Sequence, residues 1–257
     1  MSLASDLKRI EDALMEAQEV ALRYTPGRVE SSFKSSDDPV TRADTELDAL
    51  LKRLLVRPGD GWLSEETADD PARLACRRVW IVDPLDGTRE FVEGIPEWCI
   101  SVGLAVDGKA VAGGICNPAT GQVILGSIES GITLNGKQAR PTQASSLNGA
   151  KILASRSEVK RGQWKRFENR GFTIVPTGSV AYKLGCVAAG LADGTFTLVP
   201  KHEWDIAAGV ALVQATGGIV TITDGSAPLF NQPKPLIPGL IASGTDLIDS
   251  LIAATRQ

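Results

Sequence analysis

Apolar residues recur at three- and four-residue steps in two segments near the start of the chain. The first segment, residues 3–24, predicts an amphipathic helix that ends near Pro26-Gly27. The second predicts a helix that Pro58-Gly59 ends, and its apolar stripe consists of Leu47, Leu50, Leu51, Leu54 and Leu55. The polar stretch between them, residues 31–39, predicts a loop or an irregular hairpin.

From Val79 onward the pattern changes to short apolar runs typical of strands. The run 79–82 stops at Asp83-Pro84, because a proline cannot continue a central ladder. Residues 100–106 and 110–116 predict two strands joined by a hairpin turn at Asp107-Gly108. The segments 123–127 and 131–134 continue the series, with Asn135-Gly136 as a further turn. We therefore expect a largely antiparallel sheet.

The second half of the chain alternates between strand and helix patterns. Strands are expected over 151–154, 172–175 and 196–199, and helices over 158–169, 181–191 and 205–216. This alternation predicts an α/β lobe. We place the boundary near residues 145–151, which gives an N-terminal α+β lobe over 1–147 and a smaller C-terminal α/β lobe over 148–257.

Composition and charge narrow the class of protein. The 257 residues are 43% hydrophobic and 23% charged, which is ordinary for a globular chain. The net charge of −4 argues against a nucleic-acid polymer as partner, because such proteins usually carry a basic face. It leaves room for a small phosphorylated substrate, since a metal site supplies positive charge locally.

The cellular location is expected to be the cytoplasm. No apolar run approaches the length that spans a bilayer, so we expect no membrane partner, and the first residues lack the design of a signal peptide. The four cysteines are scattered without close pairs, which is typical of buried thiols in a reducing compartment.

Acidic residues gather in three patches at the ends of elements: 63–67, 83–88 and 203–205. Single carboxylates in such places usually cap helices or form turns. In the second patch, however, Asp83 and Asp86 are held close together, so one should take up a proton unless a cation neutralises them. One histidine and dispersed cysteines leave no zinc-type ligand set, so a bound metal would be ligated by oxygen, as Mg²⁺ is.

Haloacid-dehalogenase-type phosphatases are a rival interpretation of the second patch. They use D-x-D followed by G-T after the first strand, with the leading Asp as nucleophile. Here the spacing is D-x-x-D, two helices precede it and Pro84 follows the first Asp, so the pattern disfavours that interpretation.

Three ordered motifs resemble the inositol monophosphatase superfamily over nearly the whole chain. They are Ser64-Glu65-Glu66, the run from Trp80 to Thr88 with Phe91, and the run 204–209 that leads to Gly217-Gly218. The resemblance implies a mixed α/β (α+β) fold, a layered αβαβα sandwich. It also implies a Mg²⁺-dependent phosphoric monoester hydrolase, and a remote alternative is an ion-binding protein without activity on the same scaffold.

Matched position by position, the resemblance implies sites for two to three Mg²⁺ ions. Glu65, Asp83 and the main-chain oxygen of Leu85 would hold one ion. Asp83, Asp86 and Asp205 would hold a second, and a third would share Glu65. Lys34 matches a lysine in a loop near the third ion.

The resemblance also implies the catalytic groups. Asp44 would accept a hydrogen bond from Thr88, whose hydroxyl would orient the attacking water. Main-chain N–H groups of Gly87 and Thr88 would hold the phosphate at a helix start. The reaction would need no covalent intermediate, since metal ions activate the water and stabilise the entering and leaving oxygens.

Two positions depart from the inositol-specific pattern. Glu90 stands before Phe91, where inositol monophosphatases usually have Asn, and this version looks like 3'(2'),5'-bisphosphate nucleotidases. Leu198, seven residues before Asp205, replaces a Glu that contacts ring hydroxyls in inositol-specific relatives. A leucine cannot accept those hydrogen bonds.

The segment 178–183 also resembles the nucleotidase branch, with substrate contacts expected from Gly178, Ser179 and Lys183. Lys183 could instead be a snorkelling residue on an amphipathic helix. The proline-containing segment 93–98 is more typical of the inositol branch. We favour a bisphosphate nucleotide, with 3'-phosphoadenosine 5'-phosphate converted to AMP; the alternative is inositol 1-phosphate or another sugar phosphate.

Three further features stay open at this level. His202 could act as a general acid, although a loop histidine is the simpler interpretation. Trp98 could stack on an adenine, although a core role is more typical of tryptophan here. Relatives are often homodimeric and sensitive to lithium, and the residues themselves decide neither property.

Overall fold

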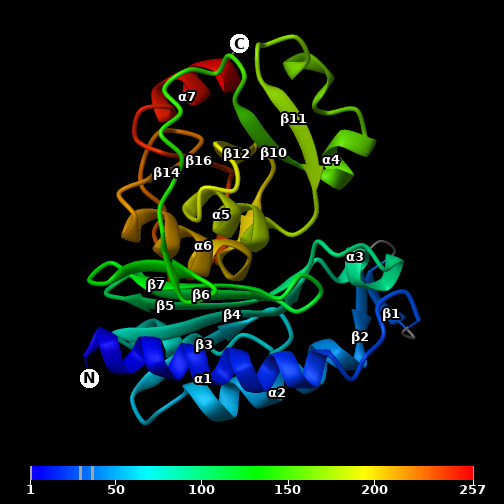
Figure 1. The fold of residues 1–257 in the computed structure, drawn as a ribbon. Helices are drawn as coiled ribbons and strands as arrows, with labels where there is room; N and C mark the ends of the chain where they lie inside the picture. The colour runs from blue at the N-terminus through cyan, green and yellow to red at the C-terminus, as the bar shows by residue number, and fades with distance from the viewer. Residues whose placement is uncertain (1, 29–30, 36–37, 257) are drawn as a thin grey trace.

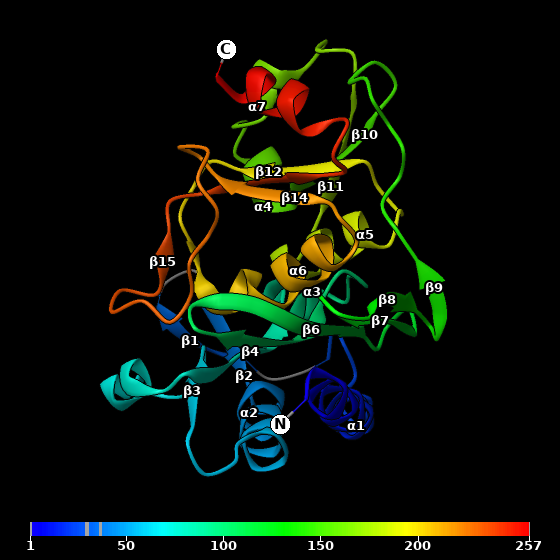
Figure 2. The ribbon, with the colours of Figure 1, turned by 90° about the vertical axis from the view of Figure 1, so that its left-hand side faces the viewer.

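The computed structural model of the protein describes residues 2–28, 31–35 and 38–256, and the side chains of residues 31–40 fall outside this description. Two sheets alternate with helices in layers, as Figures 1 and 2 show. From the bottom of Figure 1 upward, the layers are a helix pair, a seven-stranded sheet, a second helix pair, a five-stranded sheet and a final helix. The expected αβαβα sandwich is thus confirmed.

The first sheet follows chain order from edge to edge. β3 and β4 are parallel, and every later neighbouring pair is antiparallel, as the turn pattern predicted. Its strands are β3 (Asp60–Ser64), β4 (Arg78–Asp86), β5 (Cys99–Val106), β6 (Lys109–Asn117), β7 (Gln122–Ser127), β8 (Gly131–Leu134) and β9 (Lys137–Ala139).

Helices cover both faces of this sheet. α1 (Leu3–Ala21) and α2 (Arg42–Leu55) pack on one face, and α5 (Val180–Ala188) and α6 (Glu203–Ala215) pack on the other. In β4, Trp80 and Val82 face α1 and α2, while Val79 and Ile81 face α6. Because both faces are buried, the strand is a continuous apolar run.

The second sheet lies above α5 and α6 in the order β11-β10-β12-β16-β14. β10 is parallel to β11 and β12, and β16 is antiparallel to its neighbours. α7 (Ile248–Arg256) and the short helix η2 (Lys165–Phe167) pack on the outer face. The strands are β10 (Lys151–Ser155), β11 (Thr173–Thr177), β12 (Gly194–Thr197), β14 (Ile219–Ile222) and β16 (Leu240–Ser243).

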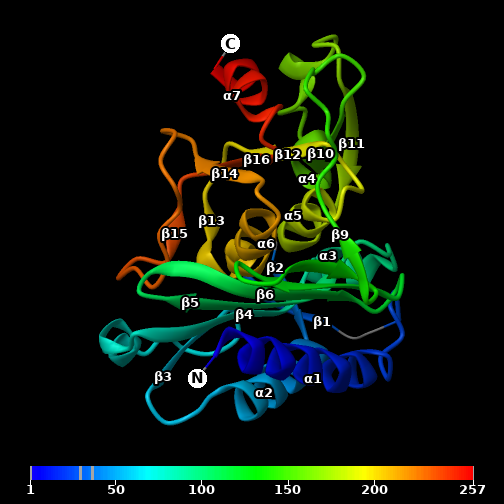
Figure 3. The ribbon, with the colours of Figure 1, turned by 60° about the vertical axis from the view of Figure 1, so that its left-hand side comes forward.

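Short elements connect the layers. α3 (Thr88–Glu93) and α4 (Arg156–Lys160) lie on the same side of the molecule, where the two halves meet (Figure 3). The others are β1 (Ser31–Ser35) paired with β2 (Asp38–Thr41), η1 (Pro71–Ala75), and β13 (Lys201–His202) paired with β15 (Leu236–Ile237). No helix within the described ranges is long and apolar enough to cross a membrane.

Three expectations about elements were wrong. β4 does not stop at Asp83: it runs to Asp86, and its pairing with β5 breaks between Asp83 and Asp86, so Pro84 stands where no ladder donor is needed. The helix over 158–169 is two short pieces, α4 and η2, separated at Gly162 with φ of 76°. α1 ends at Ala21 rather than near Tyr24. The division at residue 147 stays a prediction; the first sheet ends at Ala139 and the second begins at Lys151.

Candidate active site

The parallel pairing of β3 and β4 places two acidic residues side by side. Ser64 pairs with Val82, so Glu65, directly after β3, lies beside Asp83 within β4. The Glu65 N–H donates to the Val82 carbonyl. Asp48 on α2 fixes the loop that follows, because its carboxylate accepts hydrogen bonds from the hydroxyls of Ser64 and Thr67. Two distant motifs thereby come together.

Asp86 and Asp205 approach this edge from the two halves of the molecule. Asp86 ends β4, and its Oδ2 accepts hydrogen bonds from the Ser179 hydroxyl at 2.7 Å and the Ala181 N–H at 2.6 Å. Asp205 lies in the first turn of α6, where its Oδ2 accepts from the His202 N–H at 2.9 Å. A carboxylate is favourable there because helix N-termini carry partial positive charge.

Glu65, Asp83, Asp86 and Asp205 line one cleft of about 270 Å³ together with Gly87 and Thr88. Burial, followed by the negative charges of Glu65 and Asp86, raises the pKa of Asp83 well above its usual range. Burial and then the charge of Asp86 raise the pKa of Asp205 to about 8. The cleft is therefore a place where carboxylates repel one another and favour a neutralising cation or proton.

The donor set fits a hard, oxygen-ligated cation. Within the described residues, no three His, Cys, Asp or Glu side chains form a metal-binding group by themselves. This is compatible with Mg²⁺, which usually takes one or two carboxylates, keeps several waters and completes its shell with substrate phosphate oxygens. Asp86 and Asp205 each accept the hydrogen bonds above through Oδ2, and among the described residues no donor forms a hydrogen bond with Oδ1 of either.

Asp44 contacts Thr88, which lines the cleft. The Thr88 hydroxyl lies 3.2 Å from Asp44 Oδ1 and 3.0 Å from the Leu85 carbonyl oxygen. Asp44 also closes the capping box of α2, since its Oδ2 accepts from the N–H and hydroxyl of Thr41. Burial raises the pKa of Asp44, and these hydrogen bonds oppose the rise. The expected contact between Asp44 and Thr88 is thus present, together with the Leu85 oxygen.

Gly87 permits the turn that leads from β4 into α3. Its φ is 97°, and a Cβ there would lie 3.0 Å from the Glu97 carbonyl oxygen and 3.1 Å from Trp98 Cα. Any other residue would be both strained and crowded. α3 begins at the next residue, so the N–H groups of its first turn have no partner within the helix itself.

The start of α5 forms the opposite side of the site. Glu97 Oε2 accepts hydrogen bonds from the Gly178 N–H at 2.7 Å and from the Arg156 guanidinium, which joins the two halves. A Cβ at Gly178 would lie 2.5 Å from Glu90 Cγ, so only glycine fits. Ser179 follows, and its hydroxyl both holds Asp86 and caps α5 at the Tyr182 N–H.

Lys183 lies beneath this segment rather than in the cleft. Its side chain is 3% exposed, and its ammonium donates to the carbonyls of Ser179 at 2.6 Å and Thr177 at 3.3 Å. The geometry is therefore that of a buried cation holding the main chain beneath the cleft, and the snorkelling alternative does not describe it. Burial lowers the pKa of Lys183, while the nearby charge of Asp86 opposes this.

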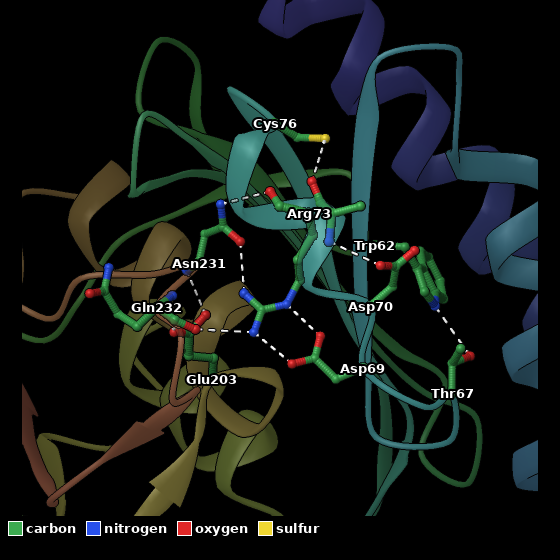
Figure 4. A network of polar contacts seen from close by, with 10 residues as sticks. Trp62, Thr67, Asp69, Asp70, Arg73, Cys76, Glu203, Asn231 and Gln232 are labelled. Atoms are coloured by element: carbon green, nitrogen blue, oxygen red, sulfur yellow. Dashed lines mark hydrogen bonds and ion pairs between the residues drawn. The ribbon is translucent and has the colours of Figure 1, made fainter.

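A polar network holds the start of α6, where Asp205 lies (Figure 4). Glu203 is fully buried, and its carboxylate accepts from the N–H groups of Asn231 and Gln232. The Arg73 guanidinium donates to Asn231 Oδ1 at 2.8 Å and to the Gln232 carbonyl at 3.0 Å. Of the third acidic patch, Glu203 is thus structural and Asp205 faces the cleft.

Several other expected residues lie away from the cleft. Trp98 is 1% exposed and packs edge-on against Phe91, so it is a core residue. Leu198 lines a separate cavity beside Trp164 and Phe196. The His202 ring stacks on Trp204 with ring centroids 4.3 Å apart. Lys34 belongs to β1, and its side chain lies outside the described part of the structure.

The sequence reasoning gave no role to four polar residues that line the cleft: Arg89 of α3 and, from the C-terminal half, Ser157, Arg161 and Lys201. Ser157 and Arg161 belong to α4 and its C-cap, and Lys201 belongs to β13. No local pattern distinguishes these residues from other surface side chains, because only the packing of the two halves brings them to the carboxylates. The cleft therefore includes cations from the C-terminal half as well as carboxylates.

Comparison with known proteins gives the family. The model of the inositol monophosphatase family matches residues 6–257. The chain belongs to the inositol monophosphatase family. It is 33% identical over 237 residues to an inositol-1-monophosphatase of Rhizobium meliloti, which covers 88% of this chain and 85% of that protein.

Solved structures agree with this family assignment. The extragenic suppressor protein suhB from Bartonella henselae has a TM-score of 0.83 at 27% identity, covering 98% of this chain and 99% of that one. CysQ from Bacteroides thetaiotaomicron, a bacterial member of the inositol monophosphatase family, has a TM-score of 0.78 at 26% identity, covering 93% and 97%. The chain is accordingly a phosphatase of this family, and the resemblance inferred from its motifs is confirmed.

Proposed function

We propose that the protein is a Mg²⁺-dependent phosphomonoesterase that hydrolyses a small phosphorylated metabolite. The observation that carries this proposal is the convergence of Glu65, Asp83, Asp86 and Asp205 on one cleft. Glu65 follows β3, Asp83 and Asp86 belong to β4, and Asp205 belongs to α6. The cleft that they line also includes Gly87 and Thr88 at the start of α3. Bound Mg²⁺ would neutralise them, polarise the phosphoryl oxygens and lower the pKa of water.

The protein's own residues would then position the reactants. The N–H groups at Gly87 and Thr88 would hold the phosphate, and the Thr88 hydroxyl, between Asp44 and the Leu85 carbonyl, would orient the attacking water. The water oxygen forms a bond to phosphorus as the ester P–O bond breaks. The leaving alkoxide takes a proton, and the products are an alcohol and inorganic phosphate.

For the substrate we favour a 3'(2'),5'-bisphosphate nucleotide such as 3'-phosphoadenosine 5'-phosphate. Arg161 and Lys201 line the cleft and suit a substrate with more than one negative group. Leu198 offers no acceptor for ring hydroxyls and lies in another cavity. The competing candidate is inositol 1-phosphate, which the name of the Rhizobium meliloti relative favours.

Phosphate release from a substrate panel tests both levels of the proposal. The panel contains 3'-phosphoadenosine 5'-phosphate, inositol 1-phosphate and glycerol 2-phosphate, each assayed with Mg²⁺ and with a chelator. We expect Mg²⁺-dependent release with the highest kcat/KM for the nucleotide. If the nucleotide is inert and inositol 1-phosphate reacts well, the substrate assignment is wrong. If no compound releases phosphate, the phosphatase activity itself is wrong.

A further inference from the structure

The catalytic cleft contains cations as well as carboxylates. The carboxylates lie mainly on the side of the first sheet, together with Arg89 of α3, while Arg161 and Lys201 come from the C-terminal half. Lys201 is close enough to Asp205 that its positive charge opposes the rise in the pKa of that carboxyl. An anionic substrate bound in the cleft would therefore lie near the cations Arg161 and Lys201 as well as near the carboxylates.

Neighbouring cations are already used by the protein itself. Arg156 is paired with Glu97 and also donates to the Pro176 carbonyl. The ammonium of Lys183 is held by main-chain carbonyls. By contrast, among the residues that the structure describes, no salt bridge involves Arg161 or Lys201, and the Arg161 guanidinium donates only to Gln163 Oε1, at 3.3 Å.

Arg161 and Lys201 belong to other elements than the start of α3, where the scissile phosphate is proposed to bind. That phosphate is assigned to the start of α3, beside the carboxylates of β4. Arg161 caps the C-terminal end of α4, and Lys201 begins β13 just before α6. Both residues thus line the cleft from elements of the C-terminal half.

We propose that Arg161 and Lys201 bind a second anionic group of the substrate, the phosphate that is not hydrolysed. This inference rests on the proposed function, because it assigns the second phosphate of a bisphosphate substrate to named residues. A guanidinium and an ammonium are suited to this task, since hydrogen bonds between charged groups are stronger than neutral ones. The pair would select bisphosphates over monophosphates by contacts made only with the former.

Kinetics with matched substrates test the assignment. In the variants Arg161→Met and Lys201→Met, we expect kcat/KM for 3'-phosphoadenosine 5'-phosphate to fall about 10-fold or more, the usual loss for a hydrogen bond to a charged group. The value for adenosine 3'-phosphate, which lacks the second phosphate, should fall much less, so the ratio of the two kcat/KM values should drop in both variants. Lys160→Met is the matched control: it removes an exposed cation from α4 that does not line the cleft.

Binding of the product provides a readout that needs no metal and no turnover. Adenosine 5'-phosphate keeps the second phosphate, so calorimetric titration in chelator should show weaker binding to both variants than to the wild type. Adenosine should bind all of them equally. Equal losses for the mono- and bisphosphate substrates, or unchanged binding of adenosine 5'-phosphate, would overturn the assignment. A different outcome would separate the two proposals. If the wild type hydrolyses no phosphomonoester but both variants bind adenosine 5'-phosphate more weakly than it does, the proposed activity is wrong and the anion site stands.

Discussion

Ser179 has a backbone conformation that side-chain-bearing residues seldom adopt. Its φ is 52° and its ψ is 127°, in a region that favours glycine. Strain of this kind costs about 1–3 kcal/mol and persists only where the surroundings enforce it. Here the hydroxyl donates to Asp86 and accepts from the Tyr182 N–H, so one side chain orients a carboxylate of the cleft and caps α5.

Removing the Ser179 hydroxyl should weaken the binding of Mg²⁺. In Ser179→Ala and Ser179→Gly, Asp86 loses its O–H donor and its orientation. We expect the half-saturating Mg²⁺ concentration for phosphate release to rise about 10-fold, as is typical for residues that orient metal ligands.

Stability separates the two Ser179 variants. The glycine variant should be more stable to urea than the alanine variant by about 1 kcal/mol, because glycine adopts a positive φ without strain. An unchanged Mg²⁺ requirement in both variants would show that the hydroxyl does not position Asp86.

At the scale of elements, the site depends on how α6 is held at its first turn. Glu203 is buried with two N–H donors from the segment before β15, and Arg73 ties that segment to η1. Arg73 itself is 2% exposed and also pairs with Asp69 at 2.6 Å. Asp205 lies in the first turn of α6, and the network therefore ties this turn to η1, beside the edge of the first sheet (Figure 4).

Arg73→Met should destabilise the protein by about 3 kcal/mol, because it leaves buried acceptors and the Glu203 carboxylate without a cationic neighbour. Arg77→Met is the matched control. Arg77 pairs with Asp107 on the surface, where the side chains are 75% and 61% exposed, and such pairs contribute no more than about 1 kcal/mol. Urea unfolding measures both changes, and equal losses would contradict the structural role assigned to Arg73.

The sequence predicted correctly those turns and element ends that a few neighbouring residues specify. The turns at Asp107-Gly108 and Asn135-Gly136 are present, with positive φ at all four residues. The acidic patches were found because strand ends and helix starts can be read from the pattern. The long helix over 158–169 was wrong, since Gly162 and η2 interrupt a sequence whose periodicity alone favours a helix.

The rest of the site depends on packing between distant segments. Arg161 and Lys201 reach the cleft only when α4 and β13 are placed against the first sheet. Likewise, the sequence left open whether Lys183 is buried, and its exposure of 3% is known only from the fold. Composition and periodicity carry no information on such contacts, so these positions could be interpreted only from the fold.

At the scale of the whole molecule, the carboxylates of the cleft make stability depend on both pH and Mg²⁺. The pKa of Asp205 is raised to about 8 in the folded protein, above its value in the unfolded chain. The proton therefore stabilises the folded state: this contribution is fully present below the unfolded pKa and is lost as the pH rises toward about 8. Mg²⁺ would replace the missing proton.

We therefore expect chelation of Mg²⁺ to lower Tm more at pH 8 than at pH 6. Calorimetric scans with excess Mg²⁺ and with chelator at each pH measure this difference. In Asp205→Asn the difference between the two pH values should shrink, because the titrating carboxyl is gone. A Mg²⁺ effect on Tm that is the same at both pH values would contradict this coupling.

The most direct test of the central claim is phosphate release by the wild type and by Asp86→Asn, with and without Mg²⁺. Asp86 ends β4 in the cleft, and the substitution keeps its shape while removing its charge. We predict that Mg²⁺-dependent release falls at least about 100-fold, the scale of a lost electrostatic contact in catalysis, while the circular dichroism spectrum stays the same. Release equal to that of the wild type would contradict the assignment of this cleft as a metal-dependent phosphatase site.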